Sequence, residues 1–461
     1  METILPDNDG SGQSREYVLR MVEERGIRSV QLWFTDVLGT LKAVTIAPAE
    51  LADALEDGMT FDGSSIDGFS RVQEADMVAN PDPETFEILP WRNGSGEALV
   101  ARIFCDISNT DGTAFEGSPR YVLAQAMKSA KEAGYTFFAA PEIEYFYFGG
   151  SEGSSGPDYS GPRLLDSRSY FDLASSELTS ELCRQSVEAL EDMGIPVEHT
   201  QHEDAPSQHE IDLRYTDALT MADTVMTARM IVKEVARRHG VFASFMPKPR
   251  QDLQGSGMHT HLSLFLGDAN AFYSADDPVG LSSTARQFVA GLISHAPEIT
   301  AVTNQWVNSY KRLVPGFEAP THATWARNNR SALVRVPHVR HARPETTRIE
   351  YRATDSGSNP YLAFAMLLAA GMQGIREGYE LPGETTVNVF ETAPQELRNQ
   401  GVAGLPQDLS EAISLMEQSS LARHTLGEHA FEWFIRNKRE ECRQYREHVS
   451  SFELDRYLHI L

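Results

Sequence analysis

The sequence contains the segment Gly255-Ser-Gly-Met-His-Thr-His-Leu-Ser263, in which polar and apolar side chains alternate after a glycine-rich turn. This alternation is typical of a half-buried β-strand. Side chains two positions apart on a strand point to the same face, so His259, His261 and Ser263 should lie together. The segment therefore predicts a strand that carries two imidazoles and a hydroxyl on one face.

Three further segments place charged groups on otherwise apolar strands. In Pro141-Glu-Ile-Glu-Tyr-Phe146, the carboxylates of Glu142 and Glu144 share a face. The other two are 202–210, where Glu203 and Glu210 flank a turn, and 348–352, where Arg348, Glu350 and Arg352 share a face. A charge that faces a protein interior is costly unless it is paired or bound to a metal.

Two interpretations fit these four segments. One is a cleft that holds hard divalent cations, because carboxylates with one or two imidazoles suit Mg²⁺ or Mn²⁺. Nearby arginines would then bind phosphate through their bidentate forks. The alternative is the solvent-exposed face of a sheet with cross-strand Glu–Arg pairs. Residue spacing alone does not decide between them.

The chain has 461 residues, more than the roughly 250–300 at which a single hydrophobic core stops growing, so two domains are expected. With 40 Lys and Arg against 66 Asp and Glu, the formal net charge is −26. This charge argues against nonspecific binding to nucleic acid or to anionic membranes. It is compatible with cationic ligands, but it favours an acidic shell that only keeps the protein in solution.

The remaining composition indicates a cytoplasmic protein. Three widely spaced cysteines form no disulfide framework and no CxxC motif. The longest apolar run, residues 361–372, is too short to span a membrane. The N-terminal residues are polar and acidic, and they resemble neither a signal peptide nor a transit peptide.

The order of predicted elements indicates an α+β protein with two unequal domains. We expect a flexible tail over 1–14, a small domain over 15–110 and a large domain over 118–461. For the small domain we predict a helix over 15–25, a loop over 61–68 and strands over 30–34, 42–46, 86–90 and 98–107. For the large domain we predict strands over 136–148, 197–203, 208–213, 259–265 and 347–353, and helices over 177–193, 217–239, 281–296, 360–377, 408–418 and 428–445.

Six segments, in this order, resemble the signature motifs of type I glutamine synthetases. They are FDGSS at 61–65, PEIE at 141–144, FMPKP at 245–249, GSGMHTH at 255–261, NSYKRLVPG at 308–316 and NRSA at 329–332. The short segment 149–168 resembles the alpha subgroup of that family. Segments 218–223 and 303–307 are most similar to an actinobacterial paralogue group, some members of which are thought to join glutamate to polyamines.

The resemblance implies a small β-grasp-like N-terminal domain and a large α+β catalytic domain. It also implies a homo-oligomer, expected to be a dodecamer of two hexameric rings, with active sites between neighbouring subunits. The implied ligands are glutamate, ATP as co-substrate, ammonium or a polyamine, and two or more Mg²⁺ or Mn²⁺ ions per site.

Motif by motif, the resemblance also implies roles for individual residues. One metal ion would be held by Glu144, Glu203 and Glu210, and the other by Glu142, His259 and Glu350. Residues near ATP would be His261, Ser263, Arg335 and Arg348. Residues that bind the other substrates would be Ser65, Tyr170, Glu144, Gln254, Gly255, Arg312 and Arg352. Catalytic roles would fall to Asp62 as the base toward ammonium, Glu318 in a closing flap and Arg330 at the transferred phosphoryl group.

Two site positions depart from the family pattern. Gln254 replaces the usual Asn before Gly-Ser-Gly, and Gln201 replaces the first His of the usual His-His-Glu. The expected function is ATP-dependent ligation of ammonia to glutamate through a γ-glutamyl phosphate. The alternative is ligation of a polyamine after the same activation step. A silent paralogue that only binds a regulator is disfavoured, because no metal-ligand position is lost.

Overall fold

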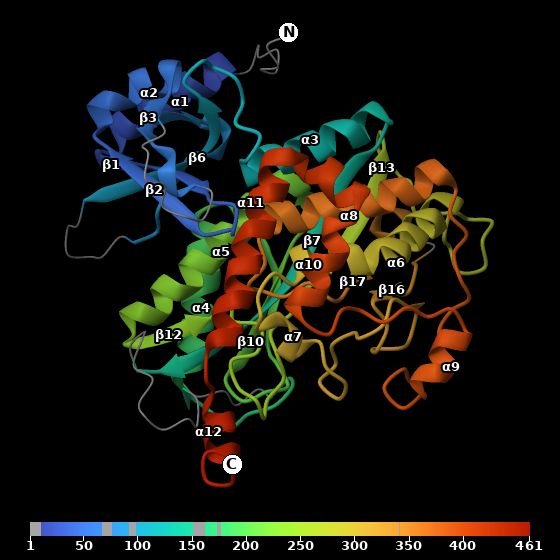
Figure 1. Ribbon diagram of the computed structural model, residues 1–461. Helices are drawn as coiled ribbons and strands as arrows, with labels where there is room; N and C mark the ends of the chain where they lie inside the picture. Colours follow the sequence, from blue (N-terminus) through green and yellow to red (C-terminus); the bar gives the residue numbers. More distant parts are fainter. Residues whose placement is uncertain (1–10, 67–75, 92–97, 151–161, 173–176, 341) are drawn as a thin grey trace.

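The computed structural model describes residues 11–66, 76–91, 98–150, 162–172, 177–340 and 342–461. Two β-sheets organise these residues, and each sheet covers its own apolar core (Figure 1). Among the described helices, none combines the length and the apolar composition that crossing a membrane requires.

The N-terminal sheet has the strand order β2-β1-β6-β4-β3, and β5 also pairs with β6. Its strands are β1 (Ile27–Thr35), β2 (Leu41–Ile46), β3 (Met59–Asp62), β4 (Asp76–Pro81), β5 (Glu87–Ile88) and β6 (Leu99–Asn109). Strand β1 runs antiparallel to β2 and parallel to β6. Helices α1 (Ser11–Glu24) and α2 (Leu51–Asp57) accompany this sheet, together with the 3₁₀ turns η1 (Pro48–Glu50), η2 (Gly63–Ser65) and η3 (Pro83–Thr85). Its fully buried core includes Val18, Val30, Leu32, Leu51 and Ile103.

The structure changes two expectations for this unit. Helix α1 begins at Ser11, so it includes four residues expected in the tail, whereas residues 1–10 lie outside the described part. The loop predicted from Phe61 was wrong for its first two residues, because Phe61 and Asp62 end strand β3. Pairing with β4, a strand that the sequence analysis missed, extends β3 into the Gly/Ser-rich segment.

The large sheet has the strand order β15-β16-β17-β13-β7-β10-β9. These strands are β7 (Thr136–Gly149), β9 (Val197–His202), β10 (Gln208–Leu213), β13 (Met258–Leu266), β15 (Trp325–Ala326), β16 (Val334–Arg335) and β17 (Ile349–Tyr351). Short strands β8 (Arg163–Leu164), β11 (Thr216–Asp217) and β12 (Val241–Ser244) pair with β7, and β14 (Ala269–Asn270) pairs with β13. Strand β7 is therefore the central strand, with which five other strands of the sheet pair.

The large unit also contains helices. They are α3 (Pro119–Glu132), α4 (Glu177–Asp192), α5 (Ala218–Arg238), α6 (Ser283–Thr303), α7 (Ser309–Arg312), α8 (Pro360–Glu377), α9 (Pro394–Asn399), α10 (Leu409–Glu417), α11 (Ser420–Glu447) and α12 (Ser451–Tyr457), with the 3₁₀ turn η4 (Pro344–Thr346). Helices α6 and α8 lie side by side (Figure 1). They approach so closely that a Cβ added at Gly291 would collide with the carbonyl oxygen of Ala370.

Of two predicted helix boundaries, one is wrong and the other is confirmed. Helix α6 continues to Thr303 through Pro297, where we predicted its end. A proline removes only one helical hydrogen bond, and the tight packing on α8 holds the helix beyond it. Element α11 consists of two helices on either side of Gly427, whose backbone (φ 72°, ψ 161°) is not helical. The second helix therefore begins at residue 428, as predicted, and the first, over 420–426, was not predicted.

A buried arginine joins the two sheets' units. Arg120, at the start of α3, donates to Asp106 of β6 at 2.6 Å and to Asp82, which follows β4, at 2.7 Å. The same guanidinium lies 3.2 Å from Asp223 of α5, and Asp223 accepts a hydrogen bond from the Tyr361 hydroxyl of α8 at 2.5 Å. One charge network thus fixes the N-terminal sheet to the helices of the large unit.

We expect Arg120→Ala to lower the free energy of unfolding by about 3–5 kcal/mol, because it leaves the buried Asp223 without its cation. Urea unfolding at a fixed chain concentration measures this change. The control is Arg184→Ala, which breaks only exposed pairs within α4 and should leave the midpoint unchanged. An equally small effect of both variants would contradict the assignment of Arg120 as the junction.

Candidate active site

Three adjacent antiparallel strands bring the predicted acidic residues together. In the register of the sheet, Glu142 of β7 lies opposite His259 of β13 on one side and opposite Asp212 of β10 on the other. Two positions along β7, Glu144 lies opposite Glu210. Directly paired residues project to the same face, so these side chains form one cluster.

The groups of the cluster lie close enough together to bind one metal ion. His259 Nδ1 lies 3.5 Å from a Glu142 oxygen and 4.0 Å from a Glu350 oxygen, and His259 Nε2 lies 3.8 Å from Glu144. Atoms of Glu142, Glu210 and His259 that could hold a metal all lie within 4.8 Å of one another. Oxygen donors with one imidazole fit Mg²⁺ or Mn²⁺.

The cluster buries several carboxylates close together, and cations would stabilise their negative charges. Burial, followed by the charge of Glu203, raises the pKa of Glu144 to about 8. Burial and the charge of Glu144 raise the pKa of Glu210 to about 12, and burial also raises the pKa of Glu203. Burial lowers the pKa of His259 to about 4, which keeps its imidazole neutral, the form that binds metals. A divalent ion at the cluster would offset the cost of burying these negative charges.

Two buried residues of this face, Asp212 and Gln208, were not predicted from the sequence. Asp212 lies 2.9 Å from His199 Nε2, and burial with the charge of Glu142 raises its pKa to about 8. Gln208 donates to Glu144 at 3.2 Å and to the carbonyl of Gly255 at 3.0 Å. Both alternate with Glu210 on β10, so the period of two that placed Glu210 could have identified them.

Arginines surround the acidic cluster. Arg335 donates to the fully buried Glu350 at 2.6 Å, and Arg352 pairs with the other oxygen of the same carboxylate. Arg312 is buried; it donates to the carbonyl of Ala353 at 2.7 Å and reaches His259 Nε2 at 3.4 Å. Positively charged side chains thus lie beside the carboxylates, and a phosphate group at the cluster could contact these arginines.

A pocket of about 680 Å³ opens beside the cluster. Predicted nucleotide residues His261, Ser263 and Arg348 line it, as do Glu142 and Asp212 of the cluster. His261 Nε2 lies 2.6 Å from Glu142, and Arg348 Nε donates to His261 Nδ1 at 3.3 Å. The lining also includes Arg340 and Arg343, two cations that the sequence analysis did not single out. Arg335, the fourth predicted nucleotide residue, is not part of this lining.

Loops bring further predicted residues to the cluster. Arg330 donates to Glu318 at 3.3 Å, and Glu318 adopts a φ of 58°, a strained value for a residue with a side chain. The charge of Glu318 contributes to the raised pKa of Glu203. After burial, the charge of Glu203 raises the pKa of the Tyr170 hydroxyl, so this residue also borders the cluster.

The two glutamines that depart from the family pattern bind acidic neighbours. Gln201 donates to Glu203 at 2.8 Å and to Glu210 at 2.7 Å, so it links two of the predicted ligands. Gln254, beside Gly255, donates to the carboxylate of Asp204. Neither substitution removes a carboxylate from the site.

Asp62 and Ser65 are not brought to the cluster within this single chain. They lie at the end of β3 and in η2, on the N-terminal sheet, apart from β7, β10 and β17 (Figure 1). The Asp62 carboxylate accepts hydrogen bonds from the Ser64 backbone at 2.9 Å and from the Ser64 hydroxyl at 3.0 Å. Its predicted catalytic role therefore depends on a second subunit.

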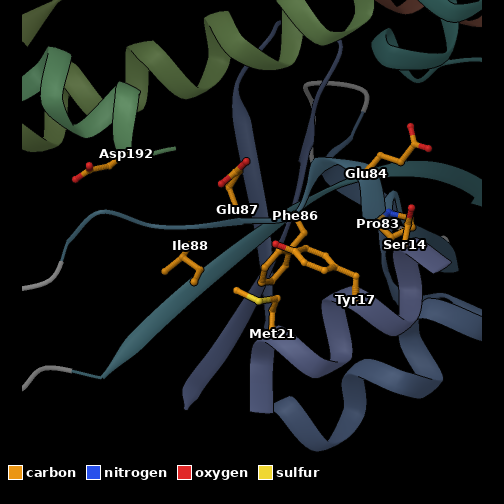
Figure 2. A pocket seen from close by; sticks show the side chains of 9 residues that line it. All are labelled: Ser14, Tyr17, Met21, Pro83, Glu84, Phe86, Glu87, Ile88 and Asp192. Atoms are coloured by element: carbon orange, nitrogen blue, oxygen red, sulfur yellow. The ribbon is translucent and has the colours of Figure 1, made fainter. Parts of the chain in front are cut away.

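Another pocket, of about 530 Å³, lies between α1, the β5 region and the end of α4. Figure 2 shows its lining, which includes the Tyr17 and Phe86 rings and the Glu87 side chain of β5. None of the predicted site residues lines it, so the carboxylate cluster remains the candidate active site.

Comparisons with known proteins agree with this assignment. A family model for the catalytic domain of glutamine synthetase matches residues 116–457, and one for the β-grasp domain of glutamine synthetase matches residues 26–110. The chain is 53% identical to a glutamine synthetase of Mycolicibacterium smegmatis, over 97% of this chain and 99% of the relative. It is 44% identical to a glutamine synthetase of Thermotoga maritima, over 96% of this chain and 99% of the relative.

Among solved structures, a GmaS–ADP complex is similar at a TM-score of 0.84 and 31% identity, over 96% of this chain and 99% of that chain. Apo GmaS is similar at 0.82 and 31% identity, over 95% and 99%. The β-grasp unit, the α+β catalytic unit and the acidic cluster beside an arginine-lined pocket are thus found in a chain that belongs to the glutamine synthetase family of ATP-dependent ligases.

Proposed function

We propose that this enzyme joins ammonia to the side-chain carboxylate of glutamate with hydrolysis of ATP to ADP and phosphate. The observation that carries the proposal is the buried convergence of Glu142, Glu144, Glu210 and Glu350 on His259, beside an arginine-lined pocket. Full-length similarity to curated glutamine synthetases supports the same reaction. The enzyme would work in the cytoplasm, where ATP is made; its three cysteines are free thiols.

The cluster is proposed to hold two or more Mg²⁺ or Mn²⁺ ions. Glu144, Glu203 and Glu210 would hold one ion, and Glu142, His259 and Glu350 another. Such ions would supply Lewis-acid neutralisation of the phosphate oxygens. Five carboxylates carry −5 against +4 from two divalent ions, so the loaded site would be nearly neutral before ATP enters.

The chain's own residues would then order the two chemical steps. His261, Ser263, Arg335 and Arg348 would bind ATP, and Arg312, Arg352, Gly255 and Gln254 would orient glutamate. A carboxylate oxygen of glutamate attacks the γ-phosphorus, the bond to ADP breaks, and a γ-glutamyl phosphate forms. Arg330 would neutralise the charge that is spread over the transferred group, since phosphoryl transfer depends on positioning and charge stabilisation.

Amide formation needs a neutral amine. Tyr170, Glu203 and Glu318 would hold ammonium together with Ser65 of a neighbouring subunit, and Asp62 of that neighbouring subunit would accept one of its protons. The nitrogen then attacks the acyl carbon, and phosphate leaves. The active oligomer would therefore be a ring with sites between subunits, proposed as a dodecamer.

A second candidate is ligation of a larger amine. It is favoured by the similar GmaS structures and by Gln201 and Gln254, which change the polar lining of the substrate region. Phosphate release with ATP, Mg²⁺ and glutamate, compared with ammonium, putrescine or spermine, separates the two functions. Turnover with a polyamine but not with ammonium would overturn the proposed reaction.

We expect Glu318→Ala to uncouple ATP use from amide formation. The carboxylate bridges to Arg330 from a strained backbone position, which suits a loop that closes over the acyl phosphate and excludes water. Without it, phosphate released per glutamine formed should rise above one. The control is Glu428→Ala, which breaks only an exposed pair with Arg423. A fall in both products at a constant ratio would contradict this role for Glu318.

A further inference from the structure

A second cluster lies on the opposite face of strands β9 and β10. His202 and His209 are directly paired across these strands, and their ring centroids are 4.7 Å apart. Their neighbours Gln201 and Glu210 form the adjacent pair, which faces the carboxylate cluster. Asp166, which follows β8, reaches the two histidines. All three side chains are buried: His202 is 6% exposed, His209 is 3% exposed, and the Asp166 side chain is 4% exposed.

The hydrogen bonds of His202 determine which of its nitrogens could bind an ion. Nδ1 lies 2.7 Å from the carbonyl oxygen of Glu203. A carbonyl only accepts, so Nδ1 carries the hydrogen and donates it. His202 Nε2 lies 3.2 Å from Asp166 Oδ1, close enough for the two atoms to share a proton when no ion is bound. A metal ion that replaces this proton could bind both atoms.

His209 and Asp166 each add an atom without a partner. Among the described residues, His209 Nε2 and Asp166 Oδ2 are buried and form no hydrogen bond. The other His209 nitrogen, Nδ1, lies 3.4 Å from Cys183 Sγ, and Asp166 Oδ1 accepts from the Ser207 backbone at 2.8 Å. Buried polar atoms normally have hydrogen-bond partners, so two neighbouring atoms without one need a common explanation.

We propose that Asp166, His202 and His209 form a buried site for a divalent transition-metal ion of the zinc class, separate from the catalytic cations. Their ligating atoms lie within 4.8 Å of one another. Two imidazoles and one carboxylate are an established donor set for Zn²⁺. Mg²⁺ is a poor fit, because it prefers oxygen ligands and keeps several of its waters. This site does not depend on the proposed ligase reaction.

The hydrogen bonds around the cluster are those expected behind metal ligands. A histidine that binds a metal usually donates its other N–H to a carbonyl or another acceptor. His202 does so toward Glu203, itself a predicted ligand of a catalytic cation. An ion here would fasten β9 to β10 directly behind Glu203 and Glu210. Its role would be to position those carboxylates and to stabilise the strand pair.

The test uses the full-length protein, stripped of metal with a chelator and then given Zn²⁺ in the presence of excess Mg²⁺. After dialysis against Mg²⁺, we expect about one Zn²⁺ per chain by elemental analysis, and a melting temperature several degrees higher than without zinc. Both His209→Gln and Asp166→Asn should lose the retained zinc and the shift. Asp166→Asn changes no side-chain volume, so it keeps the test valid if the histidine variant does not fold.

The matched control is His199→Gln. His199 lies on β9, the strand of His202, but it pairs with Asp212 of the catalytic cluster. This variant should retain zinc. Loss of zinc from His199→Gln with retention in His209→Gln would place the ion on the catalytic face and overturn the proposal. Equal zinc in the wild type and the His209 and Asp166 variants would also overturn it, leaving a water or a His202–Asp166 ion pair. X-ray absorption of the zinc form should show two imidazole nitrogens at about 2.0–2.1 Å.

Discussion

Glu350→Ala is expected to abolish ligase activity and to lower the free energy of unfolding by about 3–5 kcal/mol. The Glu350 side chain is fully buried, and its two oxygens pair with Arg335 and Arg352. Arg352 is itself only 6% exposed, so removing the carboxylate leaves a buried cation without its partner. Breaking a buried pair in this way costs more than the pair contributes, because the remaining charge stays desolvated.

The loss of activity has a separate cause. A Glu350 oxygen lies 4.0 Å from His259 Nδ1. Both residues are proposed to bind the metal ion that would contact the ATP phosphates. Removing groups behind a metal ligand typically costs about 10–100-fold, so loss of a ligand should exceed 100-fold. Urea unfolding at fixed chain concentration and phosphate release measure the two effects.

The matched control for Glu350 is Glu384→Ala. Glu384 also pairs with an arginine, Arg327 at 2.7 Å, but that arginine is 46% exposed. An exposed pair contributes about 0–1 kcal/mol, so this variant should stay active and nearly as stable. If Glu350→Ala unfolded like the control and kept its activity, the buried charge network would have neither of the roles assigned to it.

The acidic face was predictable from the sequence because strands have a strict period of two. Glu142 and Glu144 share a face on β7, and His259 pairs with Glu142 in the sheet. Alternation places a side chain on a face without knowledge of the partner strand. The same rule extends to Asp212, which lies in the predicted strand 208–213 but was not included among the predicted site residues.

Contacts between distant segments could not be predicted in this way. Strand β4 is defined by its pairing with β3 and β6. The buried position of Arg120 depends on three aspartates that are 14 to 103 residues away in the sequence. Nothing in the local pattern of an arginine at the start of a helix shows that it will be buried. The Asp166–His202–His209 cluster has the same origin, since Asp166 joins the histidine pair from a separate loop.

Asp62→Asn is expected to reduce glutamine formation by at least about 100-fold while ATP binding is retained, because general-base assistance contributes about 10²–10⁴-fold. The substitution keeps the oxygen that accepts from the Ser64 backbone, so the turn after β3 should be preserved. The control is Asp76→Asn, since Asp76 is exposed and lies directly opposite Asp62 on β4. Isothermal titration with a nonhydrolysable ATP analogue and a glutamine assay measure the two quantities. Equal loss of ATP binding would make Asp62 a structural residue.

The position of Asp62 also predicts that it acts on a neighbouring subunit. Within one chain, Asp62 ends β3 on the N-terminal sheet, whereas Glu142 lies on β7 of the large sheet. If sites form between subunits, a chain with Asp62→Asn and a chain with Glu142→Gln carry complementary defects. Unfolding and refolding them together in equal amounts should restore roughly a quarter of wild-type activity, the share of interfaces that combine two intact halves in a symmetric ring. Each variant alone stays inactive, so recovery can come only from shared sites. A mixed oligomer that remained inactive would show that Asp62 does not complete a neighbour's site, and the proposed ring of shared active sites would have to be abandoned.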